Sequence, residues 1–263
     1  MQPINLITLF CGRFNTFPPY LQGLRGLDYD PNKMRIIWYT NSRNPSFLKQ
    51  WEAEAQQLAA SGYTIFLYQD KTVRISSNAF IDNGIDTSEH AQKIAALYNS
   101  AMGCIPPRNK NRVFFLEDDV YAPSHTLKRL MRDLDDDKKA GYVCGIQFDR
   151  HSKNGSRMFA WDIDLVPQGD GTAPYYRGVP LECTWGIHPI GLGHLGGTLI
   201  DFSRLTGPKF RKPWFRPRVK NKIAQGLIGC DIEICWRMWQ AGIERLQDGD
   251  VRLLHYDSTG KPH

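Results

Sequence analysis

The stretch FFLEDDVYAPSHTLKRLM, Phe114–Met131, decides the fold class of this chain. The apolar run Arg112–Leu116, in which it begins, is short and rich in aromatic residues, which predicts a buried strand. Three acidic residues, Glu117–Asp119, follow that strand directly, and Ser124–Leu134 then predicts a helix. A strand that leads through a polar loop into a helix is the repeating unit of α/β folds, which bind ligands beyond the carboxyl ends of their strands.

Similar units occur on both sides of this stretch, and together they predict the architecture. Four more apolar runs have the length of buried strands, and two stretches have helical features. The strands are expected at Ile4–Cys11, Met34–Thr40, Tyr63–Gln69 and Gly141–Phe148, and the helices at Pro45–Ala60 and Ser88–Met102. We therefore expect an α/β fold with a mostly parallel central sheet flanked by helices.

The later part of the chain is less regular. Residues 150–180 are rich in Gly, Pro and polar side chains, which is typical of an insertion or a long loop. Asp231–Ala241 predicts a further helix, and Val251–Leu254 predicts a last short strand. Because no break in composition marks a second domain, residues 1–263 are expected to form one domain.

The acidic triplet has two interpretations when it is taken alone. Three adjacent carboxylates at the end of a buried strand repel one another, and a hard divalent cation such as Mg²⁺ or Mn²⁺ would relieve that repulsion. In an extended chain, Glu117 and Asp119 point to one side while Asp118 points to the other. The alternative is a cluster of carboxylates that favours the start of the following helix.

Three segments resemble those of the family-2-type inverting glycosyltransferases. Phe114–Met131 is similar to the segment of that family in which a strand enters a D-x-D-type acidic motif, with Glu117 in the first acidic place. Gly229–Ile243, GCDIEICWRMWQAGI, resembles the segment that carries an acidic pair before an aromatic-rich helix, with Cys230 in the first acidic place. His255, in VRLLHYD, stands where a histidine of the family follows a late strand.

The resemblance implies the GT-A (nucleotide-diphospho-sugar transferase) fold, with a nucleotide-sugar-binding half at 1–120 and an acceptor-binding half at 121–263. It also implies inversion by a single displacement, with Asp231 as the catalytic base and Glu233 as the second choice. The position of Asp231 also allows it simply to cap the following helix. A divalent metal ion, Mn²⁺ or Mg²⁺, would be held by Asp119, Glu117 and His255. The candidates for contacts with the nucleotide-diphosphate sugar are Arg13, Thr40, Asn41, Asp70, Lys93, Glu117 and Asp118.

A basic segment upstream of Asp231 suggests the acceptor side. Lys209–Lys222 reads KFRKPWFRPRVKNK and holds seven Lys or Arg, no acidic residue and three aromatic residues. Cations with interspersed aromatic rings suit an anionic acceptor, such as a modified nucleic-acid base, and a saccharide or glycolipid acceptor is an equal alternative. A loop that closes over the donor diphosphate is a third. The acceptor-binding candidates are Trp214, Arg216, Trp185 and His188.

Composition and charge limit which partners, metal sites and cellular locations are expected. The net charge of +6 favours anionic partners or serves solubility alone. The six cysteines form no CxxC pair, so a zinc or redox pair is not expected. No apolar run reaches the ~18 residues of a membrane span, and Met1–Phe10 lacks the features of a signal peptide. We therefore expect a cytoplasmic protein with free thiols.

Two other enzyme classes and one binding function compete with the glycosyltransferase hypothesis. A nucleotidyltransferase usually has a Gly-rich loop after its first strand, and Leu9–Arg13 contains one glycine. A Rossmann oxidoreductase requires a GxGxxG motif at the same place, which is absent. A non-catalytic nucleic-acid-binding module would use Lys209–Lys222 and leave Asp119 and Asp231 without a role.

Overall fold

The computed structural model describes residues 3–73, 87–106, 111–147, 160–166, 175–181, 185–216 and 229–262. Its central feature is an eight-stranded sheet, in which β10 and β9 run opposite to the other strands. The strands, in spatial order, are β3 (Thr64–Gln69), β2 (Met34–Thr40), β1 (Ile4–Phe10), β4 (Arg112–Phe115), β10 (Thr198–Asp201), β6 (Ala140–Ile146), β11 (Glu244–Arg252) and β9 (Ile187–Pro189).

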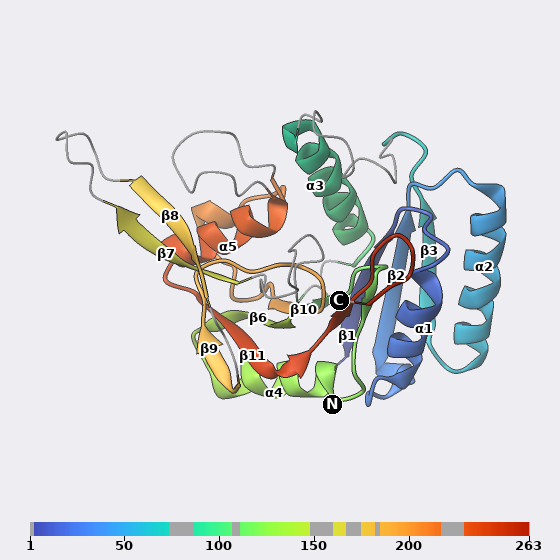
Figure 1. Ribbon diagram of the computed structural model, residues 1–263, viewed down its shortest axis with the longest axis horizontal. Helices are drawn as coiled ribbons and strands as arrows, with labels where there is room; N and C mark the ends of the chain where they lie inside the picture. Colours follow the sequence, from blue (N-terminus) through green and yellow to red (C-terminus); the bar gives the residue numbers. More distant parts are fainter. Residues whose placement is uncertain are drawn as a thin grey trace.

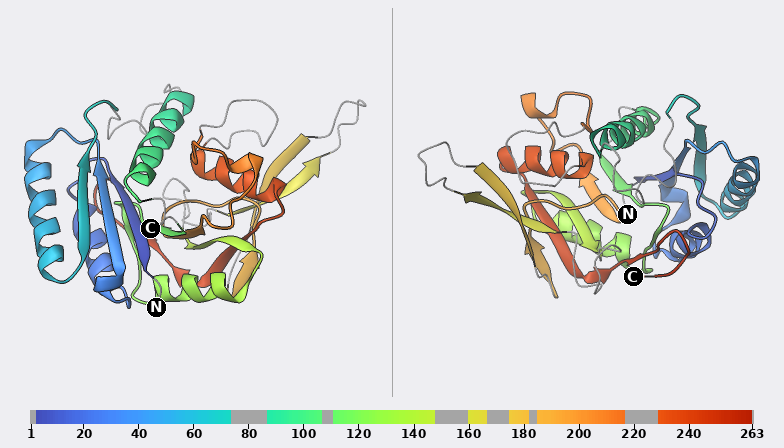
Figure 2. Two further views of the ribbon diagram at one scale, coloured as in Figure 1. Left: turned by 180° about the vertical axis from the view of Figure 1, so that it is seen from behind. Right: turned by 45° about the horizontal axis from the view of Figure 1, so that its top comes forward.

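Helices cover both faces of this sheet (Figures 1 and 2). One face packs against α1 (Phe17–Gly26), α2 (Pro45–Ala60) and α4 (Thr126–Asp136), and the other packs against α3 (Thr87–Gly103) and α5 (Cys230–Gln240). An apolar core lies on each face of the sheet. Alternate residues of the strands contribute to one core or the other, because successive side chains of a strand point to opposite faces. The mixed α/β sheet with flanking helices is the architecture that the sequence predicts.

Local signals gave accurate element boundaries. The helix expected at Pro45–Ala60 and the strand expected at Met34–Thr40 have those bounds in the structure. The side chain of Asn44 accepts hydrogen bonds from the backbone N–H groups of Ser46 and Phe47, which caps the first turn of α2.

Two strands of the sheet and one helix differ from the expectation or were missed. The strand expected at Val251–Leu254 spans the end of the longer β11 and the start of β12 (Leu254–His255), and the sequence of β11, ERLQDGDVR, is too polar to predict a buried strand. The antiparallel strand β10 has no helix before it to signal its direction. Helix α1 was missed because Phe17–Gly26 contains two prolines and two glycines.

Two small sheets flank the central one. Strands β5 (Val120–Tyr121) and β12 (Leu254–His255) form an antiparallel pair. Strands β7 (Trp161–Val166) and β8 (Tyr175–Pro180) form a second pair within the stretch 150–180 that was expected to be an insertion.

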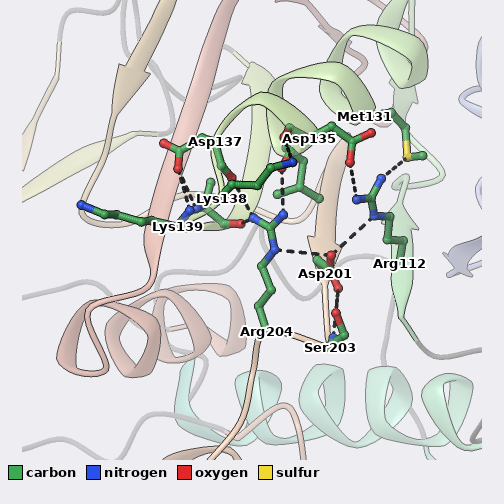
Figure 3. A network of polar contacts seen from close by, with 11 residues as sticks. Arg112, Met131, Asp135, Asp137, Lys138, Lys139, Asp201, Ser203 and Arg204 are labelled. Atoms are coloured by element: carbon green, nitrogen blue, oxygen red, sulfur yellow. Dashed lines mark hydrogen bonds and ion pairs between the residues drawn. The ribbon is translucent and has the colours of Figure 1, made fainter.

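Polar contacts fasten α4 beside the amino end of β4 and the carboxyl end of β10 (Figure 3). Arg112 pairs with Asp135 of α4 and with Asp201 of β10. Arg204 also pairs with Asp201 and donates to the carbonyl oxygens of Leu134 and Asp137. These contacts lie at the end of β4 opposite to the acidic triplet, so they position α4 without entering the candidate site.

Two expectations concern the whole chain. Among the described residues, no helix combines the length and the apolar composition that crossing a membrane requires. The five cysteines that the structure describes are free thiols, and Cys183 lies outside the described residues.

Candidate active site

The loops after β1 and β2 meet at the carboxyl edge of the sheet. Gly12, which follows β1, has a φ of 86°, a conformation that glycine adopts without strain. A Cβ atom at Gly12 would lie 2.5 Å from the hydroxyl oxygen of Ser42 in the loop after β2. A larger residue at this position would therefore push the two loops apart.

The residues expected to contact the nucleotide lie in these loops, where they also hold the loops in place. Thr40 is buried, and its hydroxyl donates to the carbonyl of Phe10 at 2.9 Å. Asn41 is buried beside it, and the backbone N–H of Asp70 donates to the carbonyl of Thr40 at 2.7 Å. The structure thus brings Thr40, Asn41 and Asp70 together at one end of β1, β2 and β3.

The carboxylate of Asp70 is occupied by its own loop. It accepts hydrogen bonds from the backbone N–H groups of Thr72 and Val73, from the hydroxyl of Thr72 and from the hydroxyl of Tyr39. Burial opposes its charge, but these hydrogen bonds outweigh burial and lower the pKa of Asp70. Lys93, another candidate, lies half-buried on α3.

The acidic triplet divides as the alternation of an extended chain predicts. Asp118 turns to the loop after β1, where its carboxylate accepts a 3.1 Å hydrogen bond from the backbone N–H of Cys11. Only 2% of Asp118 is exposed; burial raises its pKa, and the charge of Arg13 opposes that rise. Glu117 and Asp119 instead belong to a second group of side chains.

That second group, here named the metal group, consists of Glu117, Asp119 and His255, the side chains that could hold a metal ion. Each offers one ligand atom, and these atoms all lie within 4.8 Å of one another. The pairing of β5 with β12 creates the group, because it sets His255 opposite Val120, and the backbone N–H of Tyr256 donates to the carbonyl of Asp119 at 2.8 Å. Two carboxylates and an imidazole are ligands that Mn²⁺ and related divalent cations accept, so this donor set fits a metal ion.

Arg13 lies against the carboxylates of both aspartates. Its guanidinium pairs with Asp119 at 2.6 Å and with Asp118. The oxygen of Asp119 that faces Arg13 also lies 3.2 Å from Nε2 of His255. Arg13 was expected to bind the diphosphate of the donor. In the structure it pairs with Asp119, which is one of the three residues of the metal group.

Asp231 lies in the first turn of α5. This helix begins at Cys230, one residue before the expected start, and Gly229 is its N-cap residue, so Asp231 does not cap the helix. Asp231 is half-buried, and its carboxylate accepts a 2.9 Å hydrogen bond from the backbone N–H of Ile232. Burial raises the pKa of Asp231 to about 6, although backbone hydrogen bonds oppose the rise.

Glu233, the second choice for the base, is engaged elsewhere. Its carboxylate pairs with Arg237 one helical turn later at 2.8 Å. Arg237 also donates to the carbonyl oxygens of Lys209 and Trp214. The pair therefore fastens the start of the basic segment to α5, a role that the sequence pattern did not reveal.

The described part of the basic segment is held from two sides. The side chain of Asn99 on α3 donates to the carbonyl of Phe215 and accepts from its backbone N–H. Phe215 is fully buried, and Trp214 is half-buried with its ring centroid 5.0 Å from that of Phe202. Arg216 donates back to carbonyl oxygens of its own loop. Residues 217–222 lie outside the described residues.

The other two acceptor candidates lie at the far edge of the sheet, on or beside β9. Trp185 is 64% exposed, and the guanidinium of Arg252 lies 4.1 Å from its ring centroid. Nε2 of His188 lies 2.6 Å from the carbonyl oxygen of Trp185. The structure therefore groups these two residues with each other and with the end of β11.

Tyr98 on α3 packs with its ring centroid 5.6 Å from that of Phe115 on β4 and 5.1 Å from that of Phe215. It is buried, and burial, followed by the charge of Glu117 and that of Asp231 among others, raises its pKa well above the ordinary value. Sequence reasoning missed Tyr98, because its spacing on α3 fits a core residue.

The sequence matches no protein-family model and no curated protein. The fold, however, is shared with solved glycosyltransferases. A mannosyltransferase from Pyrobaculum calidifontis, solved with GDP-mannose and Mn²⁺, superposes with a TM-score of 0.57 at 14% identity, covering 96% of this chain and 56% of that one. GalNAc-T7, solved with UDP, GalNAc and Mn²⁺, gives 0.58 at 12% identity, covering 99% and 45%.

A third structure, residues 1–349 of S. aureus TarS, superposes with a TM-score of 0.52 at 10% identity, covering 96% of this chain and 59% of that one. This chain thus spans about half the length of the structures that it resembles. At such low identities the likeness shows the fold, which is the GT-A fold that the sequence resemblance implied.

Proposed function

We propose that this chain is a metal-dependent glycosyltransferase that moves a sugar from a nucleoside-diphosphate donor to an acceptor hydroxyl, with inversion. The observation that carries the proposal is the convergence of Glu117, Asp119 and His255 within 4.8 Å at the carboxyl edge of a GT-A sheet. Similar folds are solved with Mn²⁺ and nucleotides, which supports the same use of this group.

The metal group supplies one part of the chemistry. A bound divalent cation, Mn²⁺ or Mg²⁺, would neutralise the charge that develops on the leaving diphosphate. Glu117, Asp119 and His255 would hold it. The loops that carry Arg13, Thr40 and Asn41 would bind the nucleotide, because they lie beside the group at the ends of β1 and β2.

Asp231 is the proposed general base. A carboxylate accepts a proton from an alcohol more readily when its pKa is raised, and burial raises that of Asp231 to about 6. Its position in the first turn of α5 fixes it on a rigid element. Glu233 is the weaker candidate, since its carboxylate is paired with Arg237.

The acceptor side is proposed around the segment at Trp214 and Arg216, which Arg237 and Asn99 hold beside α5. The aromatic and basic composition of this segment suits a saccharide, a glycolipid or a modified nucleic-acid base. Trp185 and His188 at β9 are more distant candidates along the same sheet.

Donor binding and hydrolysis across a panel of nucleotide sugars, with Mn²⁺ or Mg²⁺, tests the proposal. We expect one donor to bind and to be hydrolysed slowly only when metal is present, and Asp119→Ala to lose both effects. For Asp231→Asn, we expect donor binding to persist and transfer to an acceptor to be lost. Transfer by the wild type should fall as pH drops below about 6, where Asp231 becomes protonated.

A donor panel in which no nucleotide sugar binds would contradict the proposal. If the folded wild type binds no nucleotide sugar in the presence of metal, the glycosyltransferase proposal is wrong. Salt-sensitive binding of nucleic acid that the Asp119 and Asp231 variants retain would then favour the binding-module alternative. Transfer of a nucleotidyl group from a nucleoside triphosphate would favour the nucleotidyltransferase instead.

A further inference from the structure

Gln147 stands at the carboxyl end of β6, beside the metal group but outside every role proposed so far. Only 2% of it is exposed. Its side-chain oxygen Oε1 is buried and has no hydrogen-bond partner among the residues that the structure describes. Burying an amide oxygen without a hydrogen-bond partner is unfavourable, so a ligand or a water molecule is expected to bind such an atom.

Gly196 shows where this oxygen points. A Cβ atom built on Gly196 would lie 2.8 Å from Oε1 of Gln147 and 2.7 Å from Oε2 of Glu117. The two oxygens therefore both lie close to Gly196, although Gln147 stands at the end of β6 and Glu117 near the end of β4. Any side chain at Gly196 would clash with both oxygens, so their placement depends on a glycine at this position.

The chemistry of the two oxygens defines the ligand. A carboxylate oxygen and an amide oxygen both accept hydrogen bonds, so a group placed against them must donate. Sugar hydroxyl groups donate in this way, and the donor sugar must lie beside the metal-bound diphosphate if the proposed function is right. A neutral amide oxygen is a weaker partner for a divalent cation than the carboxylates and imidazole already grouped there.

We propose that Gln147 binds a ring hydroxyl of the donor sugar, with Glu117 beside it, and so helps to select which sugar is transferred. This inference rests on the proposed function and names the part of the donor that Gln147 contacts. Gly196 lies against both oxygens and, having no side chain, permits their placement. The backbone supports the arrangement, since the N–H of Leu253 donates to the carbonyl of Ile146 at 2.9 Å, directly before Gln147.

The test compares the affinities of three ligands for the wild type and Gln147→Leu. The ligands are Mn²⁺ alone, the nucleoside diphosphate with Mn²⁺, and the nucleotide sugar selected by the donor panel with Mn²⁺. We expect the affinities for the metal and for the diphosphate to stay within about twofold. The affinity for the intact nucleotide sugar should fall about tenfold, as the loss of one buried hydrogen bond implies.

A second arm uses donors that lack single hydroxyl groups. One deoxy-sugar donor should bind wild type and Gln147→Leu equally well, because the hydrogen bond in question is then absent from both. This identifies the hydroxyl. If Gln147→Leu does not fold, Gln147→Asn serves instead, because it keeps an amide but withdraws the oxygen by one methylene group.

Gln247 offers a matched control. It is also fully buried, on β11, and its Oε1 likewise lacks a hydrogen-bond partner among the described residues. Its Nε2 lies 3.4 Å from the carbonyl of Gly145, and it sits within the strand, in register with Cys144. Gln247→Leu should therefore leave the difference between diphosphate and nucleotide-sugar affinity unchanged.

Each of the other possible results of these titrations contradicts one part of the proposal. Equal affinity of wild type and Gln147→Leu for every nucleotide sugar would overturn the role of Gln147 while leaving the glycosyltransferase proposal intact. A loss of Mn²⁺ affinity as large as the loss of sugar affinity would make Gln147 a neighbour of the metal and would overturn it too. Failure of the wild type to bind any nucleotide sugar would remove the proposed function and this inference together.

Discussion

Two acidic clusters in this molecule have similar composition and opposite character. The first holds three adjacent carboxylates, Glu117–Asp119, at the end of β4, where one arginine, Arg13, pairs with two of them. The second joins α4 to β11. It holds Asp133, Asp248 and Asp250, and it lies on the face of the sheet that α4 covers.

The second cluster neutralises itself. Arg129 donates two hydrogen bonds to Asp248, at 2.8 and 3.1 Å, and one to Asp250. Arg132 pairs with Asp133 at 3.3 Å. Burial, together with a hydrogen bond to Asp248, raises the pKa of Asp133 to about 7, so this carboxyl group holds its proton in much of the neutral range.

The balance of charge separates a structural cluster from a candidate metal site. Two arginines and one retained proton offset the three carboxyl groups around Asp248, whereas in the first cluster Arg13 pairs with Asp118 and Asp119. Among the ion pairs of the described residues, two arginines thus reach the second cluster and one reaches the first, so a divalent cation would add positive charge where fewer arginines reach. Acidity by itself does not distinguish the two regions; the number of arginines that pair with them in the described part of the chain does.

The largest expected contrast comes from the same substitution in each cluster. Asp119→Asn should weaken Mn²⁺-dependent donor binding by about 100-fold or more, because a metal ligand is lost. Its free energy of unfolding should change by about 1 kcal/mol or less, because repulsion in the triplet also falls. Asp248→Asn should do the reverse, destabilising the protein by about 3 kcal/mol through the loss of a buried ion pair.

Calorimetric titration with Mn²⁺ and denaturant unfolding measure the two effects on the same preparations. A strong loss of stability in Asp119→Asn with metal binding retained would make the first cluster structural. It would erase the contrast between the regions.

A smaller contrast is expected from the two arginines. Arg129→Met should lower the free energy of unfolding by about 2 kcal/mol, because Asp248 is left buried without its cation and Arg129 itself is partly solvated. Arg13→Met should instead raise the affinity for Mn²⁺ alone by about threefold to tenfold, because a competing positive charge leaves the site.

If Arg13 also meets the donor diphosphate, Arg13→Met should weaken binding of the nucleoside diphosphate while it strengthens binding of the metal. Separate titrations with metal and with nucleotide measure this split. Weaker binding of both ligands would show that Arg13 organises the carboxylates and does not compete with the cation.

The smallest expected effect sharpens the account of the second cluster. Because the pKa of Asp133 is raised in the folded protein, the fold binds a proton that the unfolded chain releases above about pH 4. Stability from this group is therefore lost as the pH rises through about 4 to 7. Asp133→Asn, which mimics the protonated group, should flatten that slope by about 1 kcal/mol between pH 5 and 7.

Unfolding in urea at several pH values measures the slope. Asp136→Asn, on an exposed position of the same helix, provides the control and should leave the slope unchanged. An unchanged slope in Asp133→Asn would show that Asp133 is ionised throughout this range.

Local patterns in the sequence were enough for most of the sheet and its helices. The apolar run Met34–Thr40 and the capped segment Asn44–Ala60 contain their own signals, because strand burial and helix capping depend on neighbouring residues. The sequence did not predict most of strand β11, because its charged side chains pair with residues distant in the sequence. Asp248, for example, pairs with Arg129.

The candidate site was only partly visible. Glu117–Asp119 stood out, because three carboxylates after an apolar strand are conspicuous in any sequence. Arg13 and His255 became candidates through a family resemblance, and nothing in the sequence predicted that both would touch Asp119. Gln147 gave no signal at all, since an isolated glutamine after a strand has no pattern.

The sequence by itself determined the alternation of strands and helices, the mostly parallel sheet and the acidic triplet at a strand end, because each of these depends on residues close together in the chain. Tertiary structure alone decided which arginine pairs with which carboxylate, that β5 pairs with β12 and brings His255 to Asp119, and that Gly196 lies against Gln147 and Glu117. The physical reason is range: burial and local hydrogen bonds act between neighbours, whereas the charge balance of a site sums over segments that only folding brings into contact.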